Sequence, residues 1–270
     1  MTSRPTPSRP AATASAQIDL VGRTAVVLGG TSGLGRAIAI GFANAGADVV
    51  ATGRRAALVE TVADEIEGMG RRSIRMSCDV GNVSAIEAVL GASADAFGGV
   101  DILVNAAGRI ARAPTLDMSD ADWRGILDTN LHGTLRACRV FGAHMIGRGY
   151  GRIINIGSLT SHVALHEVAA YGASKAAVAA LTKSLAIEWA GRGVCVNALV
   201  PGVFRTAHNS ALLDGTPRGK ELLMRTPMAR FGNPDDVVGP AIFLASESAR
   251  FVTGHLLAVD GGFLASGVNQ

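Results

Sequence analysis

A tyrosine and a lysine stand four positions apart in the stretch AAYGASKAAVAAL, residues 169–181. Both types are scarce in this chain, so the pair Tyr171 and Lys175 is unexpected by chance and is treated as a motif. On a helix, residues i and i+4 share a face, so the two side chains would point the same way. We expect the ammonium to lower the phenol pKa from about 10. The pair therefore predicts a general acid or base for a carbonyl and alcohol couple.

Two further polar residues extend this prediction. Ser158, in INIGSLTS, follows an expected strand and stands thirteen residues before the tyrosine, so its hydroxyl could hold the substrate oxygen beside Tyr171. Asn130, in LDTNLHG, falls in the middle of an expected helix, where asparagine is a poor helix former. Its amide could hold a water molecule or a helix distortion near Lys175 and extend a proton path to solvent.

The segments that must position these residues alternate between short apolar runs and longer helical stretches. Helices are expected from Gly33 onward and near 56–68, 82–97, 119–147 and 170–190. Repeated strand–helix units predict a doubly wound α/β fold with a parallel sheet, as one domain over residues 18–270. The expected strands are 24–28, 47–52, 73–78, 100–105, 151–156, 194–200 and 256–260.

The first strand leads into a glycine-rich turn, VVLGGTSGLGRAIA, residues 26–39. Gly29, Gly33 and Gly35 permit a tight turn and let backbone N–H groups approach a pyrophosphate at the start of a helix. A plain tight turn would need glycine too, but the position after a strand and before a helix favours a dinucleotide site.

The second expected strand ends in ATGRRAALVE, residues 51–60. A site that prefers NAD usually has an acid here to bind the ribose 2′-hydroxyl, whereas this chain has Gly53 followed by Arg54 and Arg55. A guanidinium can bind a 2′-phosphate in bidentate fashion, so the sequence favours NADP over NAD. Solvated arginines at the start of a helix remain the alternative.

Two later strand ends also carry candidate cofactor residues. Asp79 and Val80, in SCDV, would lie near an adenine pocket. The NAAG stretch would form a small-residue turn beneath a flat cofactor, at the sheet edge where such folds bind ligands. Its residues are Asn105, Ala106, Ala107 and Gly108.

The composition restricts the partners. A formal net charge of +3, with no basic cluster interleaved with aromatics, argues against a nucleic-acid partner. Three widely separated cysteines argue against disulfides and a zinc site and favour a cytoplasmic setting. No apolar run is long enough to span a membrane. Residues 1–17, rich in Pro, Ser, Thr and Ala, lack a signal-like apolar region and are expected to form a disordered arm.

Taken together, these stretches resemble the short-chain dehydrogenase/reductase family from Ile18 to the end of the chain. The matching pieces are GGTSGLG, CDV, NAAG, Asn130, Ser158, YGASK, the PG of ALVPGVFRT, and AVDGG. The resemblance implies a Rossmann-type seven-stranded sheet and hydride transfer between the nicotinamide C4 and a carbonyl or alcohol carbon. It also implies that Tyr171 transfers the proton and that Lys175 binds the nicotinamide ribose.

The same resemblance implies the remaining roles. Ser158 would orient substrate, and Asn130 would support a water relay. Cofactor contacts are implied for Thr31, Ser32 and Leu34 of the glycine turn and for Pro201, Gly202, Val203 and Thr206. Leu28 departs from the family, whose members often have threonine there, so a slightly looser NAAG loop is expected. Ser32 also lacks the basic side chain found in some members that prefer NADP.

Residues 203–226 are expected to form a mobile, irregular flap over the substrate. The stretches RTPMARFGNPDD (225–236) and TGHLLAVDGG (253–262) look similar to the gluconate 5-dehydrogenase and 2-deoxy-gluconate 3-dehydrogenase branch. Arg112 could bind a sugar-acid carboxylate, or it could be a surface arginine. His162 and His166 could line the substrate pocket or face solvent, and no third ligand clusters with these two histidines as a metal site would require.

Alternatives remain at this point. The substrate could be a sugar acid, a polyol or a 3-oxoacyl thioester. A regulator that senses NADP(H) without turnover is a different class, which would have no need of a proton donor such as Tyr171. Relatives in the family commonly form tetramers, and the small-residue face AAVAAL suits close helix packing, so a homotetramer is expected.

Overall fold

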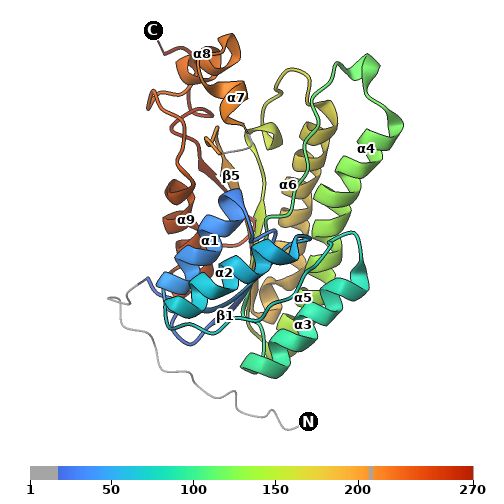
Figure 1. The fold of residues 1–270 in the computed structure, drawn as a ribbon, viewed down its shortest axis with the longest axis vertical. Coiled ribbons are helices and arrows are strands. Elements are labelled where there is room, and N and C mark those ends of the chain that lie inside the picture. The colour runs from blue at the N-terminus through green and yellow to red at the C-terminus, as the bar shows by residue number, and fades with distance from the viewer. Residues whose placement is uncertain (1–17, 207–208, 270) are drawn as a thin grey trace.

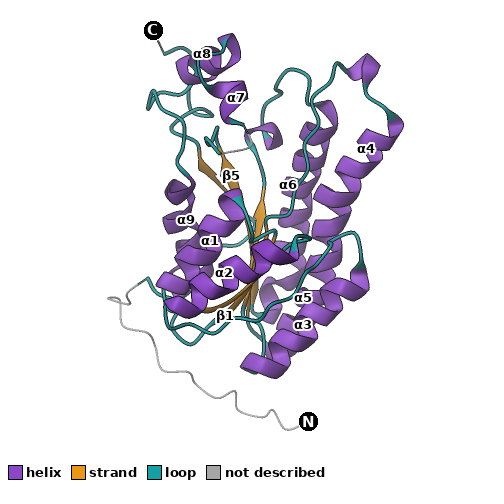
Figure 2. Ribbon diagram, viewed as in Figure 1, coloured by secondary structure: helices purple, strands orange, loops and turns teal. Residues whose placement is uncertain are grey.

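The protein is described by a computed structural model that covers residues 18–206 and 209–269. The arm expected at residues 1–17 lies outside the described residues. The rest forms one α/β unit in which a parallel sheet is covered by helices on both faces (Figures 1 and 2). The expected α/β architecture with a doubly wound parallel sheet is therefore confirmed.

The sheet contains six described strands in the order β2-β1-β3-β4-β5-β6, and every pair of neighbours is parallel. The chain runs outward from β1 to β2 and then returns to the other side of β1 to form β3. The carboxyl ends of β1 and β3 therefore flank the point where the strand order reverses, which is where such sheets bind ligands. The strands are β1 (Thr24–Leu28), β2 (Asp48–Thr52), β3 (Ile102–Asn105), β4 (Gly151–Ile156), β5 (Val194–Pro201) and β6 (Leu256–Val259).

Residues 73–78 do not form the strand that was expected there, so the described sheet has six strands and not the predicted seven. This segment runs beside β2 but makes only one isolated bridge to it, between Ser77 and Gly53. Backbone hydrogen bonds tie its two ends, from Val49 N to Arg72 O at 3.1 Å and from Cys78 N to Gly53 O at 3.0 Å. The residues between do not complete a ladder, so an apolar run at the sheet edge becomes an extended connection.

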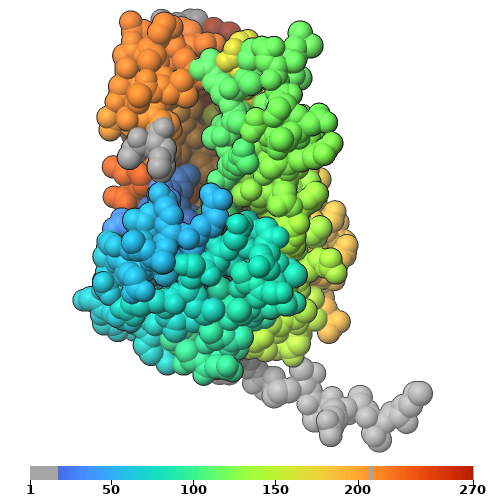
Figure 3. All heavy atoms as spheres, turned by 45° about the vertical axis from the view of Figure 1, so that its right-hand side comes forward, coloured from blue at the N-terminus to red at the C-terminus, as the bar shows by residue number. Residues whose placement is uncertain are grey.

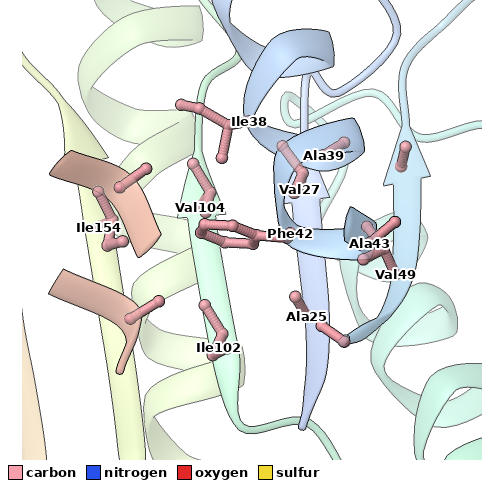
Figure 4. Packing of buried hydrophobic residues seen from close by; sticks show 14 of the residues in the cluster. Ala25, Val27, Ile38, Ala39, Phe42, Ala43, Val49, Ile102, Val104 and Ile154 are labelled. Atoms are coloured by element: carbon pink, nitrogen blue, oxygen red, sulfur yellow. The ribbon is translucent and has the colours of Figure 1, made fainter. Parts of the chain in front are cut away.

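Alternate residues of the strands pack against different helices, as a sheet covered on both faces requires. One apolar cluster joins the sheet to α1 (Gly33–Asn44), α2 (Ala56–Gly68) and α9 (Val238–Ala245). The other joins it to α3 (Val83–Phe97), α5 (Gly133–Arg148) and α6 (Ala169–Trp189). Figure 4 shows Phe42 of α1 lying over Val104, between strands that contribute Val27 and Ile154. Truncating a ring this fully buried typically costs about 3–5 kcal/mol, so this packing fixes α1 on the sheet.

The helix expected at 119–147 is interrupted. The structure has α4 (Asp120–Leu127), then a π-helical turn over Asp128–His132, then α5. A π-turn inserts an extra residue into the helix and often marks a functional position. Asn130 lies at its centre and is 1% exposed, so the distortion that its position suggested is present.

The expected flap, residues 203–226, is less irregular than predicted. Its described part contains α7 (Ser210–Leu213) and α8 (Pro217–Met224), which lie beyond the end of β5 (Figure 1). The space-filling view shows a hollow between this orange segment and the green segment that contains α4 (Figure 3). Within the described residues, no helix combines the length and the apolar character needed to cross a membrane.

Candidate active site

A cleft of about 690 Å³ opens at the carboxyl ends of β1 and β3. The first glycine turn, the NAAG loop and the start of α6 all contribute to its walls, so Tyr171 and Lys175 share it with the glycine turn. These three segments are far apart in the sequence, and the parallel sheet brings them together.

The glycine turn packs directly against the NAAG loop. Gly29 has φ of 82°, a conformation that side chains other than glycine rarely adopt, and a Cβ there would lie 2.5 Å from the backbone N of Ala107. A Cβ on Gly35 would lie 2.2 Å from the carbonyl oxygen of Gly29. The backbone can come this close only because both residues lack side chains. The cleft thus has the bare backbone surface that a dinucleotide pyrophosphate requires.

Most of the predicted cofactor residues line this cleft, and five do not. Ala106 N donates a 2.8 Å hydrogen bond to Leu28 O, so a backbone contact ties the NAAG loop to the position where family members often have a threonine. The residues on the cleft wall are Gly29, Thr31, Ser32, Leu34, Gly35, Arg54, Arg55, Asp79, Val80, Ala106, Ala107, Gly108, Tyr171, Lys175 and Thr206. Gly33 lines a neighbouring hollow beside α1, Gly202 and Val203 line a third near β6, and Pro201 and Asn105 are buried.

Asn105 is buried and connects elements of the fold instead of lining the cleft. Its side chain is 5% exposed, and Nδ2 donates to Asn155 Oδ1 at 2.8 Å. Asn155 Nδ2 in turn donates to Thr182 Oγ1 at 2.9 Å. The amide therefore connects β3 to β4 and, through Thr182, to α6, and it does not face the cleft.

The two arginines after β2 lie on the cleft wall with exposed side chains. Arg55 Nη2 lies 3.4 Å from Ser32 Oγ, which brings a guanidinium beside the N-cap of α1. Asp79 is exposed, and its Oδ1 accepts a hydrogen bond from Gly81 N at 2.9 Å, while Val80 is buried. This end of the cleft therefore carries two cations that can meet a phosphate.

Tyr171 and Lys175 lie on the same face of α6, as their spacing predicts. The Lys175 ammonium nitrogen is 5.7 Å from the centroid of the Tyr171 ring. Lys175 is 5% exposed, and its Nζ donates a 2.6 Å hydrogen bond to the backbone oxygen of Ile156 at the end of β4. The lysine is thus anchored by the sheet as well as by its helix.

The pKa values of Tyr171 and Lys175 correct one expectation. Burial raises the pKa of Tyr171, and the hydrogen bond between its side chain and Ser158 opposes that rise only in part. Burial also lowers the pKa of Lys175 to about 8. At neutral pH Lys175 still carries its charge, but its Nζ donates to the carbonyl oxygen of Ile156, and burial raises the pKa of Tyr171 all the same. The pKa of Tyr171 is therefore raised, whereas its spacing to Lys175 led us to expect a lowered value.

Ser158 lies two residues after the end of β4, as the sequence predicts. Its Oγ caps a short 3₁₀ turn by accepting from Thr160 N at 3.2 Å, while its side chain also shares a hydrogen bond with Tyr171. A hydroxyl in contact with the phenol can also hold an oxygen that exchanges a proton with it.

The Asn130 side chain forms hydrogen bonds to the loop that follows NAAG. Its Oδ1 accepts from Arg109 N at 2.7 Å, and its Nδ2 donates to Arg109 O at 2.9 Å. The same Nδ2 donates to Ser174 Oγ at 3.0 Å, and that hydroxyl donates to Tyr171 O at 2.7 Å. The π-turn therefore connects the cleft loop with the helix that carries the tyrosine.

Two of the predicted substrate residues, His162 and Arg112, are exposed and do not line the cleft. His162 is exposed on the segment after Ser158, and Arg112 is exposed on the segment after NAAG. Neither lines the cleft described above. Arg112 already has a partner, because its Nε lies 2.6 Å from Glu167 Oε2. Glu167 was not identified in the sequence.

Other residues of the site were also missed. Ile156 and Thr129 line the cleft, and Ser174 links Asn130 to Tyr171. Ser174 could have been noticed, since it stands inside the YGASK motif directly before the lysine. Ile156 contributes through its backbone oxygen, and no side-chain pattern can indicate such a contribution.

The sequence and the fold are both similar to known proteins. A family described as enoyl-(acyl carrier protein) reductase matches residues 29–264. A 2-dehydro-3-deoxy-D-gluconate 5-dehydrogenase of Bacillus subtilis is 42% identical, over 91% of this chain and 96% of that protein. A D-threitol dehydrogenase of Mycolicibacterium smegmatis is 40% identical, over 90% of this chain and 94% of that protein.

A solved structure agrees with these sequence similarities. The gluconate 5-dehydrogenase of Burkholderia cenocepacia, in complex with NADP and tartrate, matches with a TM-score of 0.89 and 38% identity, over 93% of this chain and 98% of that chain. These similarities confirm the predicted activity, an NAD(P)-dependent oxidoreductase that interconverts a secondary alcohol and a ketone. With the glycine turn, Tyr171 and Lys175 around one cleft, and a family match over residues 29–264, the chain belongs to the short-chain dehydrogenase/reductase family.

Proposed function

We propose that this protein uses NADP to interconvert a secondary alcohol and a ketone on a short polyhydroxylated carbon chain. The observation that carries the proposal is the shared cleft, in which Tyr171 and Lys175 face the glycine turn. The relatives support the substrate class, because they include a dehydrogenase of a sugar acid and one of a polyol.

The proton-transfer group is Tyr171. Its side chain is half-buried and shares a hydrogen bond with Ser158, so a substrate oxygen between the two hydroxyls would contact both. During reduction the phenol gives its proton to the forming alkoxide, and during oxidation the phenolate accepts the alcohol proton. When bound, the nicotinamide supplies or accepts the hydride and, once oxidised, a positive charge.

Lys175 and Asn130 position this chemistry. Lys175 is fixed by its 2.6 Å bond to Ile156 O, and it has further N–H donors for a ribose hydroxyl. Asn130 fixes both backbone polar groups of Arg109, next to the NAAG loop. A water relay through Asn130 is part of this proposal, and the contact from Asn130 Nδ2 to Ser174 Oγ supports a polar path at this point.

Arg54 and Arg55 account for the proposed preference for NADP. Both are exposed on the cleft wall, and Arg55 reaches Ser32 at the start of α1, where a phosphate is also favoured by the helix. We expect Arg55→Ala to weaken NADP binding by about tenfold and to leave NAD binding within about twofold. Arg192→Ala, an exposed arginine beyond α6, is the control. Equal losses for both cofactors would contradict the preference.

The activity is tested by following the reduced nicotinamide spectroscopically with sugar acids, polyols and 3-oxoacyl thioesters, each with NADP(H) and NAD(H). Turnover of a polyol or sugar acid supports the proposal. Turnover of the thioesters alone would favour the second candidate, a 3-oxoacyl thioester reductase. If Tyr171→Phe keeps both nucleotide binding and the cellular effect of the protein, a non-catalytic NADP(H) sensor is the better reading.

A homotetramer in the cytoplasm completes the proposal. The exposed faces of the described residues support assembly, since β6 is an edge strand and Ile187 of α6 is 83% exposed. Phe251, in the connection before β6, is 100% exposed. Light scattering at micromolar concentration tests this, and a monomer would contradict it.

A further inference from the structure

Glu167, two residues before the start of α6, has an unusual backbone conformation. Its φ is 65°, and among the described residues Glu167 and Ala229 are the non-glycine positions with positive φ. A side chain with a Cβ is disfavoured in this region. Such strained residues cluster at sites of function, and Glu167 stands four positions before Tyr171.

Three contacts hold Glu167 in this conformation. Its backbone oxygen accepts from Ala113 N at 3.0 Å, which joins the segment before α6 to the segment after NAAG. Its Oε2 lies 2.6 Å from Arg112 Nε, and its Oε1 lies 3.6 Å from His166 Nδ1. The carboxylate is therefore fixed between the two segments that lead to Gly108 and to Tyr171.

The ion pair adjoins the cleft along the chain, because Arg112 follows Arg109 by three residues and Glu167 precedes Tyr171 by four, and both Arg109 and Tyr171 line the cleft. Arg112 is the residue that could bind a sugar-acid carboxylate, but its guanidinium already faces the carboxylate of Glu167. The other arginine after NAAG is paired as well, since Arg109 Nη2 lies 2.8 Å from Asp122 Oδ1. A carboxylate entering here would have to displace Glu167 or lie beside it, and like charges in contact disfavour that partner.

We propose that Glu167 is a specificity-determining residue that selects uncharged polyols and their ketoses over aldonates of the same chain length. The Glu167 carboxylate accepts hydrogen bonds from substrate hydroxyls and neutralises Arg112, so the segments beside the cleft favour a neutral polyhydroxylated chain. This inference rests on the proposed function and narrows it to one of the two substrate classes named there.

The test compares matched substrates that differ only at one terminal carbon. D-glucitol is paired with D-gluconate, xylitol with D-xylonate and erythritol with D-erythronate, and kcat/KM for oxidation with NADP is measured for each. The wild-type protein is expected to favour the polyol of a pair by about tenfold or more, the size of a single unfavourable charge contact.

Glu167→Gln removes the charge with little change of shape and releases the guanidinium of Arg112. We expect it to raise the aldonate-to-polyol ratio of kcat/KM by about tenfold. Glu167→Gly removes the carboxylate and relieves the left-handed backbone, so it should fold at least as stably and shift the ratio in the same direction.

Glu67→Gln is the matched control. It removes the same charge from an ion pair at the far end of α2, where Arg75 Nη1 lies 2.8 Å from Glu67 Oε1. The control should leave the ratio within about twofold of wild type, because solvent screens a remote surface charge.

The outcomes separate the two proposals. If the wild-type protein oxidises both classes, prefers aldonates, and keeps that preference in Glu167→Gln, the role of Glu167 is overturned while the proposed function stands. An equal shift in Glu67→Gln also overturns it, since the effect would then be a general one of charge. If NADP binds but no polyol or aldonate is turned over in either direction, both proposals fail.

Discussion

The ammonium nitrogen of Lys175 donates a 2.6 Å hydrogen bond to the backbone oxygen of Ile156. This bond fixes a helix side chain to the end of β4, directly before the segment that carries Ser158. It also holds the lysine in a buried position, where its charged form is poorly solvated and its pKa falls to about 8. The buried position that fixes Lys175 in the site is therefore also the cause of its lowered pKa.

Lys175→Met is expected to stabilise the protein at neutral pH while abolishing most activity. The folded-state pKa of about 8 lies below the ordinary value of 10.5, so folding opposes protonation of Lys175. The penalty is fully present below pH ~8, amounts to about 3 kcal/mol, and disappears as pH rises past the unfolded-state pKa. Losing the bond to Ile156 offsets about 1 kcal/mol. Chemical denaturation should therefore show a gain of about 2 kcal/mol at pH 7 and a loss near pH 11.

The control for this comparison is Lys183→Met. Lys183 lies two turns further along α6 and is exposed. Its removal should change stability by less than about 0.5 kcal/mol at either pH. A Lys175→Met variant that is less stable than wild type at pH 7 would show that Lys175 folds without a solvation penalty.

The two tyrosines make the phenol pKa directly measurable. Burial raises the pKa of Tyr150 to about 12 and also raises that of Tyr171. Ultraviolet titration of the folded, cofactor-free protein should therefore show little phenolate below pH ~10, whereas the unfolded chain titrates near 10. Tyr171→Phe identifies the contribution of Tyr171. A phenolate forming near neutral pH without cofactor would refute the raised pKa.

Oxidation and reduction should respond to pH in opposite senses. Oxidation needs the phenolate, so its kcat/KM should rise with pH until Tyr171 is ionised in the cofactor complex. Reduction needs the phenol and should fall over the same range. Tyr171→Phe should lower both rates by about 10²–10⁴-fold and leave NADP affinity within a few-fold, as isothermal calorimetry can check. Retained turnover in this variant would remove Tyr171 from the proposed mechanism.

Gly35→Ala should weaken NADP binding by about tenfold or more and destabilise the fold by about 1–3 kcal/mol. The added methyl would lie 2.2 Å from Gly29 O, so either the glycine turn or α1 must move. Gly68→Ala, at the end of α2 with open space around its Cβ, should instead stabilise the protein by about 0.5–1 kcal/mol. Thermal unfolding with and without NADP measures both effects. Wild-type affinity for NADP in Gly35→Ala would contradict the role of the glycine turn in binding the cofactor.

Asn130→Ala should loosen the cleft loop more than Ser174→Ala does. The first change leaves both backbone groups of Arg109 without their side-chain partner and should cost about 1–3 kcal/mol, whereas the second removes one hydroxyl and should cost about 1 kcal/mol. Hydrogen exchange at residues 108–112 should rise in Asn130→Ala only. Equal exchange in both variants would mean that the link to α6, and not the grip on Arg109, holds the loop.

Several parts of the fold follow from the sequence because they depend on local pattern. Strands β1 and β4 were predicted with their observed bounds, and α2 likewise. The segment 73–78 shows the limit of this reasoning. Its apolar residues suit a strand, but whether an edge segment completes a ladder depends on its register with β2. The flap also resisted prediction, since α7 and α8 are too short to give a helical period.

The sequence alone determined the chemistry-bearing pair, because Tyr171 and Lys175 are neighbours on one helix face and local geometry suffices to bring them together. It also determined the glycine turn, whose residue types follow from backbone sterics. Only the tertiary structure decided which groups from other segments contact the site residues. The bond from Lys175 to Ile156 O, the grip of Asn130 on Arg109, and the pairing of Arg112 with Glu167 all join segments distant in sequence. Burial, and therefore the direction of each pKa shift, is likewise a property of the assembled core and of no single segment.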